Sequence, residues 1–219
     1  MSDFYHRGAK VTKNRQKALV PLAPPVFYLC SIKKLFLSVK QQLMTPKLEA
    51  AFQQIEEDRK QLFTLLKNYS NEVILKKPAA DKWSVAEVIG HLMVAENASL
   101  KYLQKKTQDM SKEPNAGFTG WRRLAFVKLV FVLPIKFKAP EITAPPKETK
   151  SLEALEHEWT ELRKDIYNLI STLSETDAKK SIWKHTLAGK MNIYQMLEFF
   201  GFHFKRHAGQ IQRTLKAVA

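Results

Sequence analysis

The sequence predicts an all-α fold: a four-helix bundle in which a long connection separates the second and third helices. Apolar residues recur with the 3.6-residue period of a helix in four long stretches from residue 45 onward, and no stretch keeps the period-two alternation of a half-buried strand. Four amphipathic helices of this length bury one another's apolar faces as a bundle. With 219 residues, the chain suits one helical-bundle domain at residues 45–219 and a basic, proline-containing arm at residues 1–44.

The first two helices are expected to begin at capping residues. Thr45 is a good N-cap for the first helix, and Pro46 stands at its first position, where the missing N–H of proline is not needed. Ser84 opens the second helix, and Glu87 three positions later completes a capping box. The predicted apolar faces comprise Leu48, Phe52, Ile55, Leu62, Leu66 and Tyr69 in the first helix, and Val85, Val88, Ile89, Leu92, Leu100 and Leu103 in the second.

The last two helices are expected to begin in the same way. The third starts near Ser151, and the fourth starts at Asn192, with Gln195 three residues further on. The predicted apolar faces comprise Leu152, Leu155, Trp159, Leu162, Ile166, Leu169 and Leu173 in the third helix, and Ile193, Met196, Leu197, Phe200, Phe204, Ile211 and Leu215 in the fourth.

The connection between the second and third helices, residues 109–150, is long enough to let these two helices run parallel. Within it, residues 121–137 are apolar but interrupted by Arg122, Arg123, Lys128 and Pro134. We expect a fifth short helix packed across the bundle; a lid over a pocket, a dimer surface and a membrane-contact patch are the alternatives. The proline-rich residues 140–146 are expected to be extended.

The charge of the chain is strongly basic, with 36 Lys and Arg against 21 Asp and Glu and a net charge of +15, which favours attraction to polyanions or membrane surfaces. Residues 1–44 hold eight of the basic side chains and one acid, and their apolar run is broken by prolines, unlike a signal peptide. No run is apolar enough for a transmembrane segment. No helix-turn-helix spacing accompanies the charge, so no nucleic acid is expected as a partner.

A single cysteine, Cys30, excludes a disulfide framework and is typical of a reducing compartment, so we expect a cytoplasmic protein.

Three histidines border the predicted buried faces. His203 and His207 are four residues apart on the last helix, so their Cβ atoms lie roughly 5–6 Å apart and two imidazoles can converge on one ion. His91 borders the buried face of the second helix. Three neutral imidazoles would bind a divalent ion and leave positions open, as catalytic sites do; the alternative is that all three are hydrogen-bonded core histidines. The other histidines are His6 in the arm, His157 on the polar side of the third helix, and His185.

Two of these histidine motifs resemble those of a known family. Residues 82–92 read KWSVAEVIGHL and resemble the "W-S-x-x-E-hydrophobic-x-x-H-L" signature of the DinB-like superfamily, also called DinB/YfiT-like. Residues 203–211 read HFKRHAGQI and resemble its "H-x-x-R-H-x-x-Q-I" signature. Residues 185–190 resemble its "H-P-x-x-G-x" turn, although Thr186 replaces the usual proline. The match covers about residues 45–217 and leaves the arm unexplained.

The resemblance implies a four-helix bundle that holds a divalent metal, zinc or nickel in most relatives, through His91, His203 and His207. It also implies that His185 shapes the loop at the mouth of the site, with direct ligation the less favoured alternative. Characterised relatives include transferases for low-molecular-weight thiols such as bacillithiol, mycothiol and glutathione. A thiol is therefore a candidate cosubstrate.

The sequence is compatible with metal-activated chemistry. A cation held by neutral imidazoles can lower the pKa of bound water or ionise a thiol, and because no cysteine lies near the motifs, a thiolate would have to arrive with the substrate. The predicted function is a metal-dependent enzyme of the thiol S-transferase or small-molecule hydrolase type, acting on a small-molecule substrate. The alternatives are a non-catalytic metal-binding or interaction bundle, and a basic nucleic-acid- or membrane-surface-binding module. Glu96, Glu198 and Gln210 are candidate acceptors or acid/base groups, with packing or surface roles as the favoured alternative. Lys205 and Arg206 could attract an anionic thiol, with a solvated helix face as the favoured alternative, and residues 121–133 are a candidate homodimer surface.

Overall fold

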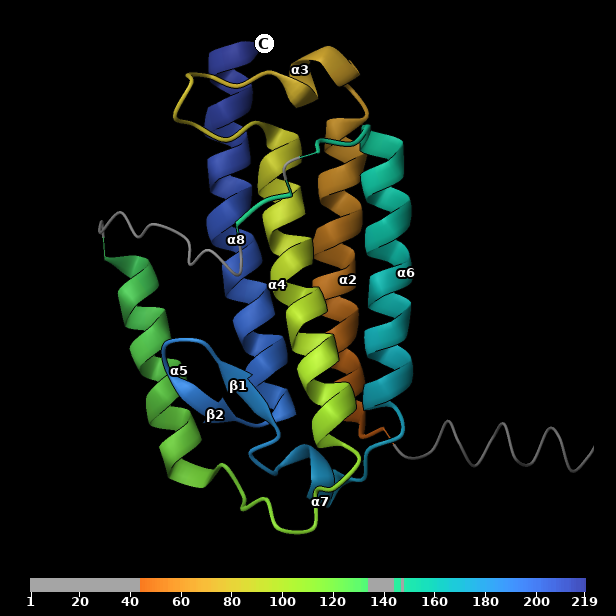
Figure 1. Cartoon of the computed structure of the whole chain (residues 1–219), viewed down its shortest axis with the longest axis vertical. Coiled ribbons are helices and arrows are strands. Elements are labelled where there is room, and N and C mark those ends of the chain that lie inside the picture. The colour runs from red at the N-terminus through yellow and green to blue at the C-terminus, as the bar shows by residue number, and fades with distance from the viewer. Residues whose placement is uncertain (1–43, 134–143, 147) are drawn as a thin grey trace, which may run out of the picture. The chain divides into compact units, whose positions relative to one another are not determined.

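The computed structural model describes residues 44–133, 144–146 and 148–219 and confirms the all-α prediction. Four long helices form a bundle: α2 (Pro46–Leu66), α4 (Val85–Lys106), α6 (Leu152–Ile170) and α8 (Ile193–Val218) (Figure 1). The predicted arm and Cys30 lie outside the described residues, except Met44 at the arm's end. Among the described residues, no helix combines the length and the apolarity that crossing a membrane requires.

Each of the four long helices begins at the capping residue that the sequence predicts. The Thr45 side chain accepts a hydrogen bond from the Leu48 N–H, and the Ser151 side chain accepts one from the Ala154 N–H. Complete capping boxes open α4, at Ser84, and α8, at Asn192. These bonds satisfy N–H groups that have no acceptor within the helix, and so fix where each helix begins.

The bundle places α2 beside α6 and α8, and α4 beside the same two helices. Helices α4 and α6 run in the same direction, which the length of the connection between them allows (Figure 1). The start of α6 is tied to the end of the bundle where α4 begins, because the Leu152 N–H donates to Asn71 Oδ1 over 2.9 Å. Residues 144–146 have no regular secondary structure and pack closely against α4. The contact is so close that a Cβ added at Gly90 would lie 2.8 Å from Pro146 Cδ.

Four short elements were not predicted. They are α3 (Asn71–Leu75), α7 (Glu175–Ala178), and an antiparallel hairpin of β1 (Trp183–His185) and β2 (Gly189–Met191). The placement of Tyr69 on the first helix is wrong, because α2 ends at Leu66 and Ser70 caps a new helix. The hairpin turn relies on Gly189, whose φ of 87° is rarely adopted by residues with a side chain.

The long connection contains the predicted fifth helix, α5 (Gly117–Val132), which packs against α8 and β2. Leu124 and Val127 are its buried apolar side chains, together with Gly120. Residues 134–137 of the predicted apolar stretch, and residues 140–143 of the proline-rich stretch, lie outside the described residues.

A network of buried ion pairs crosses the interior of the bundle. The Arg163 guanidinium of α6 donates twice to the Glu96 carboxylate of α4, over 2.5 and 2.6 Å, and the Trp159 indole N–H donates to the same carboxylate over 2.8 Å. Arg163 also pairs with Glu56 of α2, which pairs with Arg59. The charges of the two arginines and the two glutamates cancel, so this part of the core carries no net charge.

Candidate metal centre

The three predicted histidines converge between α4 and α8. One nitrogen from each of His91, His203 and His207 lies within 4.8 Å of the others. His91 Nε2 and His203 Nε2 are 3.3 Å apart, although the two residues are 112 positions apart in the sequence. The three rings meet nearly edge to face, with centroids 4.7 to 5.3 Å apart.

The helix geometry explains this convergence. His203 and His207 are one turn apart on α8, so both rings project from the same side of the helix. His91 lies in the second turn of α4, and α4 packs beside α8. His91 and His203 are buried, and His207 is half-buried at the edge of the cluster.

The cluster fits a divalent transition metal. Three imidazoles tetrahedrally placed about an ion, each at 2.0–2.1 Å, have nitrogens about 3.3 Å from one another. The separation of His91 Nε2 and His203 Nε2 equals this value. Burial, and next the neighbouring His207, hold the pKa of His203 well below its ordinary value of 6.5. Burial first, and then the nearby His91, lower the pKa of His207 to about 4. Both rings are therefore neutral at pH 7, the form in which an imidazole binds metal.

Gln210 orients one of the candidate ligands. Its Oε1 lies 2.9 Å from His207 Nδ1, so a proton on Nδ1 would be donated to the amide oxygen and Nε2 would be left free as an acceptor. Of the candidate acceptors predicted from the sequence, Gln210 is the one that contacts the histidine cluster.

Replacing Gln210 with leucine is expected to weaken metal binding by about 10- to 100-fold, because the tautomer and orientation of His207 would no longer be fixed. Titration of chelator-treated protein with zinc, followed by competition with a coloured chelator, measures this change. Gln212→Leu, on the exposed side of the same helix, is the matched control and should bind as the parent does. Equal affinities for the two variants would show that Gln210 does not position the ligand.

Aromatic side chains surround the histidines. The Trp83 ring lies 5.1 Å from the His91 ring, and the Phe199 ring stacks on His203 at 5.0 Å. Phe131, at the end of α5, lies 5.7 Å from His203. Sequence reasoning gave none of the three a role. Phe199 stands four residues before His203 and so shares its helix face, but no sequence pattern brings Phe131 to the site.

Glu96, a candidate acceptor for the site with a packing role as the favoured alternative, lies in the buried ion-pair network. Both its carboxylate oxygens accept hydrogen bonds from Arg163 inside the bundle. Glu198 is exposed and forms an ion pair with Lys128. The other predicted candidates are also placed: Lys205 is exposed, Arg206 donates to the Phe131 carbonyl oxygen, and His157 lies on the exposed side of α6, as predicted.

His185 shapes the hairpin rather than joining the cluster. Its Nδ1 accepts hydrogen bonds from the Leu187 and Ala188 N–H groups, both over 3.2 Å. The three nitrogens that lie within 4.8 Å of one another belong to His91, His203 and His207, so His185 is not part of the cluster. Burial lowers the pKa of His185 to about 4.

Acid is expected to destabilise the hairpin through His185. The unfolded chain takes up a proton near pH 6.5 and the folded chain only near pH 4, so stability is complete above pH 6.5 and is lost as the pH falls toward 4, by up to about 3 kcal/mol. His185→Asn keeps an acceptor in place of Nδ1 and removes the titration. Urea unfolding of both proteins in chelator between pH 7 and pH 4 should therefore give a shallower loss for the variant. Identical pH profiles would contradict the assignment.

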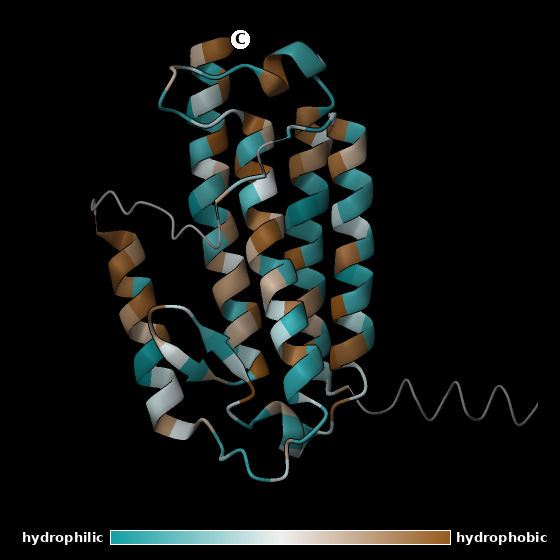
Figure 2. Ribbon diagram, viewed as in Figure 1, coloured by the Kyte–Doolittle hydropathy of each residue, from teal (hydrophilic) through white to brown (hydrophobic). Residues whose placement is uncertain are grey.

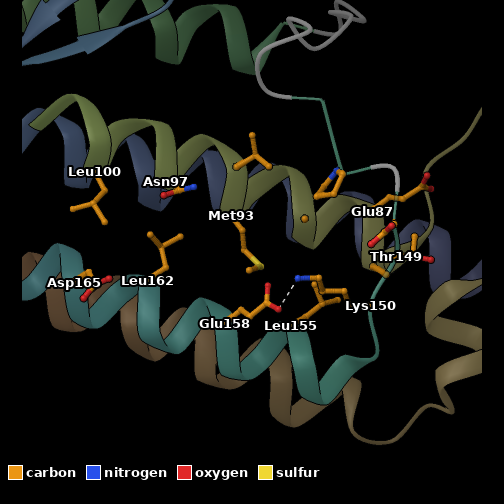
Figure 3. Close-up of a pocket in the computed structure, with 15 residues that line it drawn as sticks. Glu87, Met93, Asn97, Leu100, Thr149, Lys150, Leu155, Glu158, Leu162 and Asp165 are labelled. Carbon is orange, nitrogen blue, oxygen red and sulfur yellow. Dashed lines mark hydrogen bonds and ion pairs between the residues drawn. The ribbon is translucent and has the colours of Figure 1, made fainter. Parts of the chain in front are cut away.

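A groove of about 530 Å³ lies elsewhere on α4, on the side that packs against α6 (Figure 3). Met93 and Leu162 form part of its apolar floor, and Lys150 pairs with Glu158 at its rim over 2.6 Å. None of the three clustered histidines lines it.

Comparison with known proteins agrees with the geometry. The sequence pattern of the DinB superfamily matches residues 54–211, a span that includes all three histidines. The chain belongs to the DinB superfamily. A relative in Bacillus subtilis (strain 168), the uncharacterized protein YuaE, is 26% identical over 170 residues, which cover 74% of this chain and 95% of the relative. For this DinB-superfamily protein, family membership and the three-histidine cluster permit metal binding.

Proposed function

We propose that this protein is a metal-dependent enzyme of the thiol S-transferase or small-molecule hydrolase type. In this proposal His91, His203 and His207 hold a divalent ion, zinc or nickel. The observation that carries the proposal is the convergence of three largely buried imidazoles, with one nitrogen of each within 4.8 Å of the others and those of His91 and His203 3.3 Å apart. A bound ion would supply a Lewis acid that lowers the pKa of a coordinated thiol or water.

The residues around the cluster support an open, catalytic site rather than a closed structural one. Among the described residues the cluster has three candidate protein ligands, which would leave a fourth position for a substrate, whereas structural zinc sites have four protein ligands. Trp83 and Phe131 pack against the histidine rings and supply apolar surface beside them. Because the described part of the chain contains no cysteine, the nucleophilic sulfur would come from a low-molecular-weight thiol, which a reducing compartment such as the cytoplasm keeps reduced.

Turnover with and without a thiol tests the proposal. The zinc- or nickel-loaded protein is incubated with 1-chloro-2,4-dinitrobenzene and glutathione or bacillithiol: a carbon–sulfur bond forms, chloride leaves, and the thiol proton goes to solvent. A transferase would consume the electrophile faster than the thiol alone does, and His91→Ala would abolish this excess. A hydrolase would instead cleave p-nitrophenyl acetate without thiol.

A metal-loaded protein that is inert toward every such pair would be a metal-binding bundle without catalysis, and the proposal of an enzyme would be abandoned. If the inert protein binds a nucleic acid, with an affinity that falls steeply with salt and survives loss of His91, a basic binding module is supported instead.

A further inference from the structure

The outer face of α5 exposes an unusual amount of apolar surface. Five large side chains along it are more than half exposed: Phe118 (70%), Trp121 (58%), Phe126 (56%), Leu129 (59%) and Val132 (82%). Their spacing of three to five residues places them along one side of the helix. We call these five residues the α5 outer face. Figure 2 shows that the upper half of α5, its C-terminal half, is predominantly hydrophobic.

The helix is held in place by its other side. Leu124 and Val127 are buried, the Arg123 guanidinium donates to the Lys190 carbonyl oxygen over 2.7 Å, and the Arg206 side chain donates to the Phe131 carbonyl oxygen. These contacts come from α8 and the hairpin, and they turn the α5 outer face away from the residues that anchor the helix. A contiguous exposed apolar surface of this kind marks an interaction site.

The charges on α5 indicate what that partner is. The helix carries Arg122, Arg123 and Lys128 and no acidic residue, although Lys128 is paired with Glu198 of α8 and Arg123 with the Lys190 carbonyl oxygen. Arg122 is exposed and stands between Phe118 and Phe126 in sequence, one helical turn from each. A symmetric dimer through this face would bring two copies of a helix without acids together, and would bury Arg122 without a carboxylate from α5 to pair with it. A guanidinium beside phosphate groups, with aromatic rings at the headgroup level, meets no such penalty.

We propose that the α5 outer face docks on the surface of an anionic lipid bilayer. The apolar side chains enter the boundary between headgroups and acyl chains, and Arg122 binds lipid phosphate. The net charge of +15 attracts the protein to such a surface from a distance. The helix lies on the bilayer and does not cross it, since its 16 residues are too short to span the hydrocarbon core.

Co-sedimentation of the full chain with vesicles tests this proposal. One set of vesicles is phosphatidylcholine alone, and in the other about a third of the lipid is phosphatidylglycerol. The parent should partition into the anionic vesicles far more than into the neutral ones. Phe126→Glu with Leu129→Glu should lower that partitioning about ten-fold or more, because two apolar side chains are lost from the buried face.

A matched control separates docking from bulk charge. Leu65→Glu with Leu75→Glu makes the same change in net charge at two other exposed leucines, 40% and 38% exposed, and should bind as the parent does. Circular dichroism verifies that both double variants are folded. If both variants lose binding equally, or if neither does, the attraction is electrostatic and the α5 outer face does not dock. If the parent ignores vesicles and forms a dimer that Phe126→Glu with Leu129→Glu dissociates, the face is a contact between copies of this chain and the proposal is overturned.

Discussion

Replacing His203 with alanine is expected to remove bound metal from protein that is purified without added metal. The parent should retain close to one ion per chain, because three imidazoles whose nitrogens lie within 4.8 Å of one another can bind a divalent ion together. The variant keeps only His91 and His207. Its affinity for metal should fall by more than 10- to 100-fold, which is the usual cost of losing a residue that hydrogen-bonds a metal ligand. Elemental analysis by mass spectrometry gives the content of both proteins, and His203→Ala with His207→Ala extends the series.

His157→Ala is the control for this experiment, because it removes an exposed histidine from α6 and leaves the cluster intact. It should carry as much metal as the parent. A parent without metal after reconstitution with zinc or nickel, or a His203→Ala protein that retains a full equivalent, would show that these histidines are hydrogen-bonded core residues.

Breaking the buried ion-pair network is expected to produce the largest loss of stability. Arg163→Ala leaves the Glu96 carboxylate buried without its two guanidinium bonds, which costs about 3–5 kcal/mol of unfolding free energy. Urea unfolding monitored by circular dichroism measures the loss, in the presence of chelator so that metal content does not differ between proteins. Glu96→Leu with Arg163→Leu removes both charges and should be less destabilised than either single variant.

An exposed pair provides the comparison. Lys164 and Glu161 also form an ion pair, over 2.6 Å, but both side chains are more than half exposed. Lys164→Ala should change stability by less than about 1 kcal/mol, because water and salt screen the charges. Equal losses for Lys164→Ala and Arg163→Ala would mean that burial does not strengthen the internal network.

The long helices were predictable because their signals are local. Thr45, Ser84, Ser151 and Asn192 each cap a helix through bonds to residues three positions away, so the cap and its partner can be read together in the sequence. The short elements were not predictable in this way. Helices of four or five residues and three-residue strands are too short for a periodic pattern, and contacts from distant parts of the chain stabilise them.

The sequence predicted the site residues that share one helix face. It did not predict contacts that depend on a residue from a distant helix. His203 and His207 share a face of α8, and the structure brings them to His91. Glu96 also borders a buried face, but it meets Arg163, which lies 67 positions away in the sequence. A single sequence does not indicate which of two inward-facing polar residues meets the histidines and which meets a distant arginine.

The origin of the three histidines in two different helices has a consequence for the rigidity of the bundle. An ion held by His91 on α4 and by His203 and His207 on α8 would act as a cross-link between an early and a late segment of the chain. By mass action, free ion at 100 times its dissociation constant would add about 2.7 kcal/mol to the folded state. Amide protons of both helices near the cluster would then exchange with deuterium more slowly in the loaded protein than after chelation.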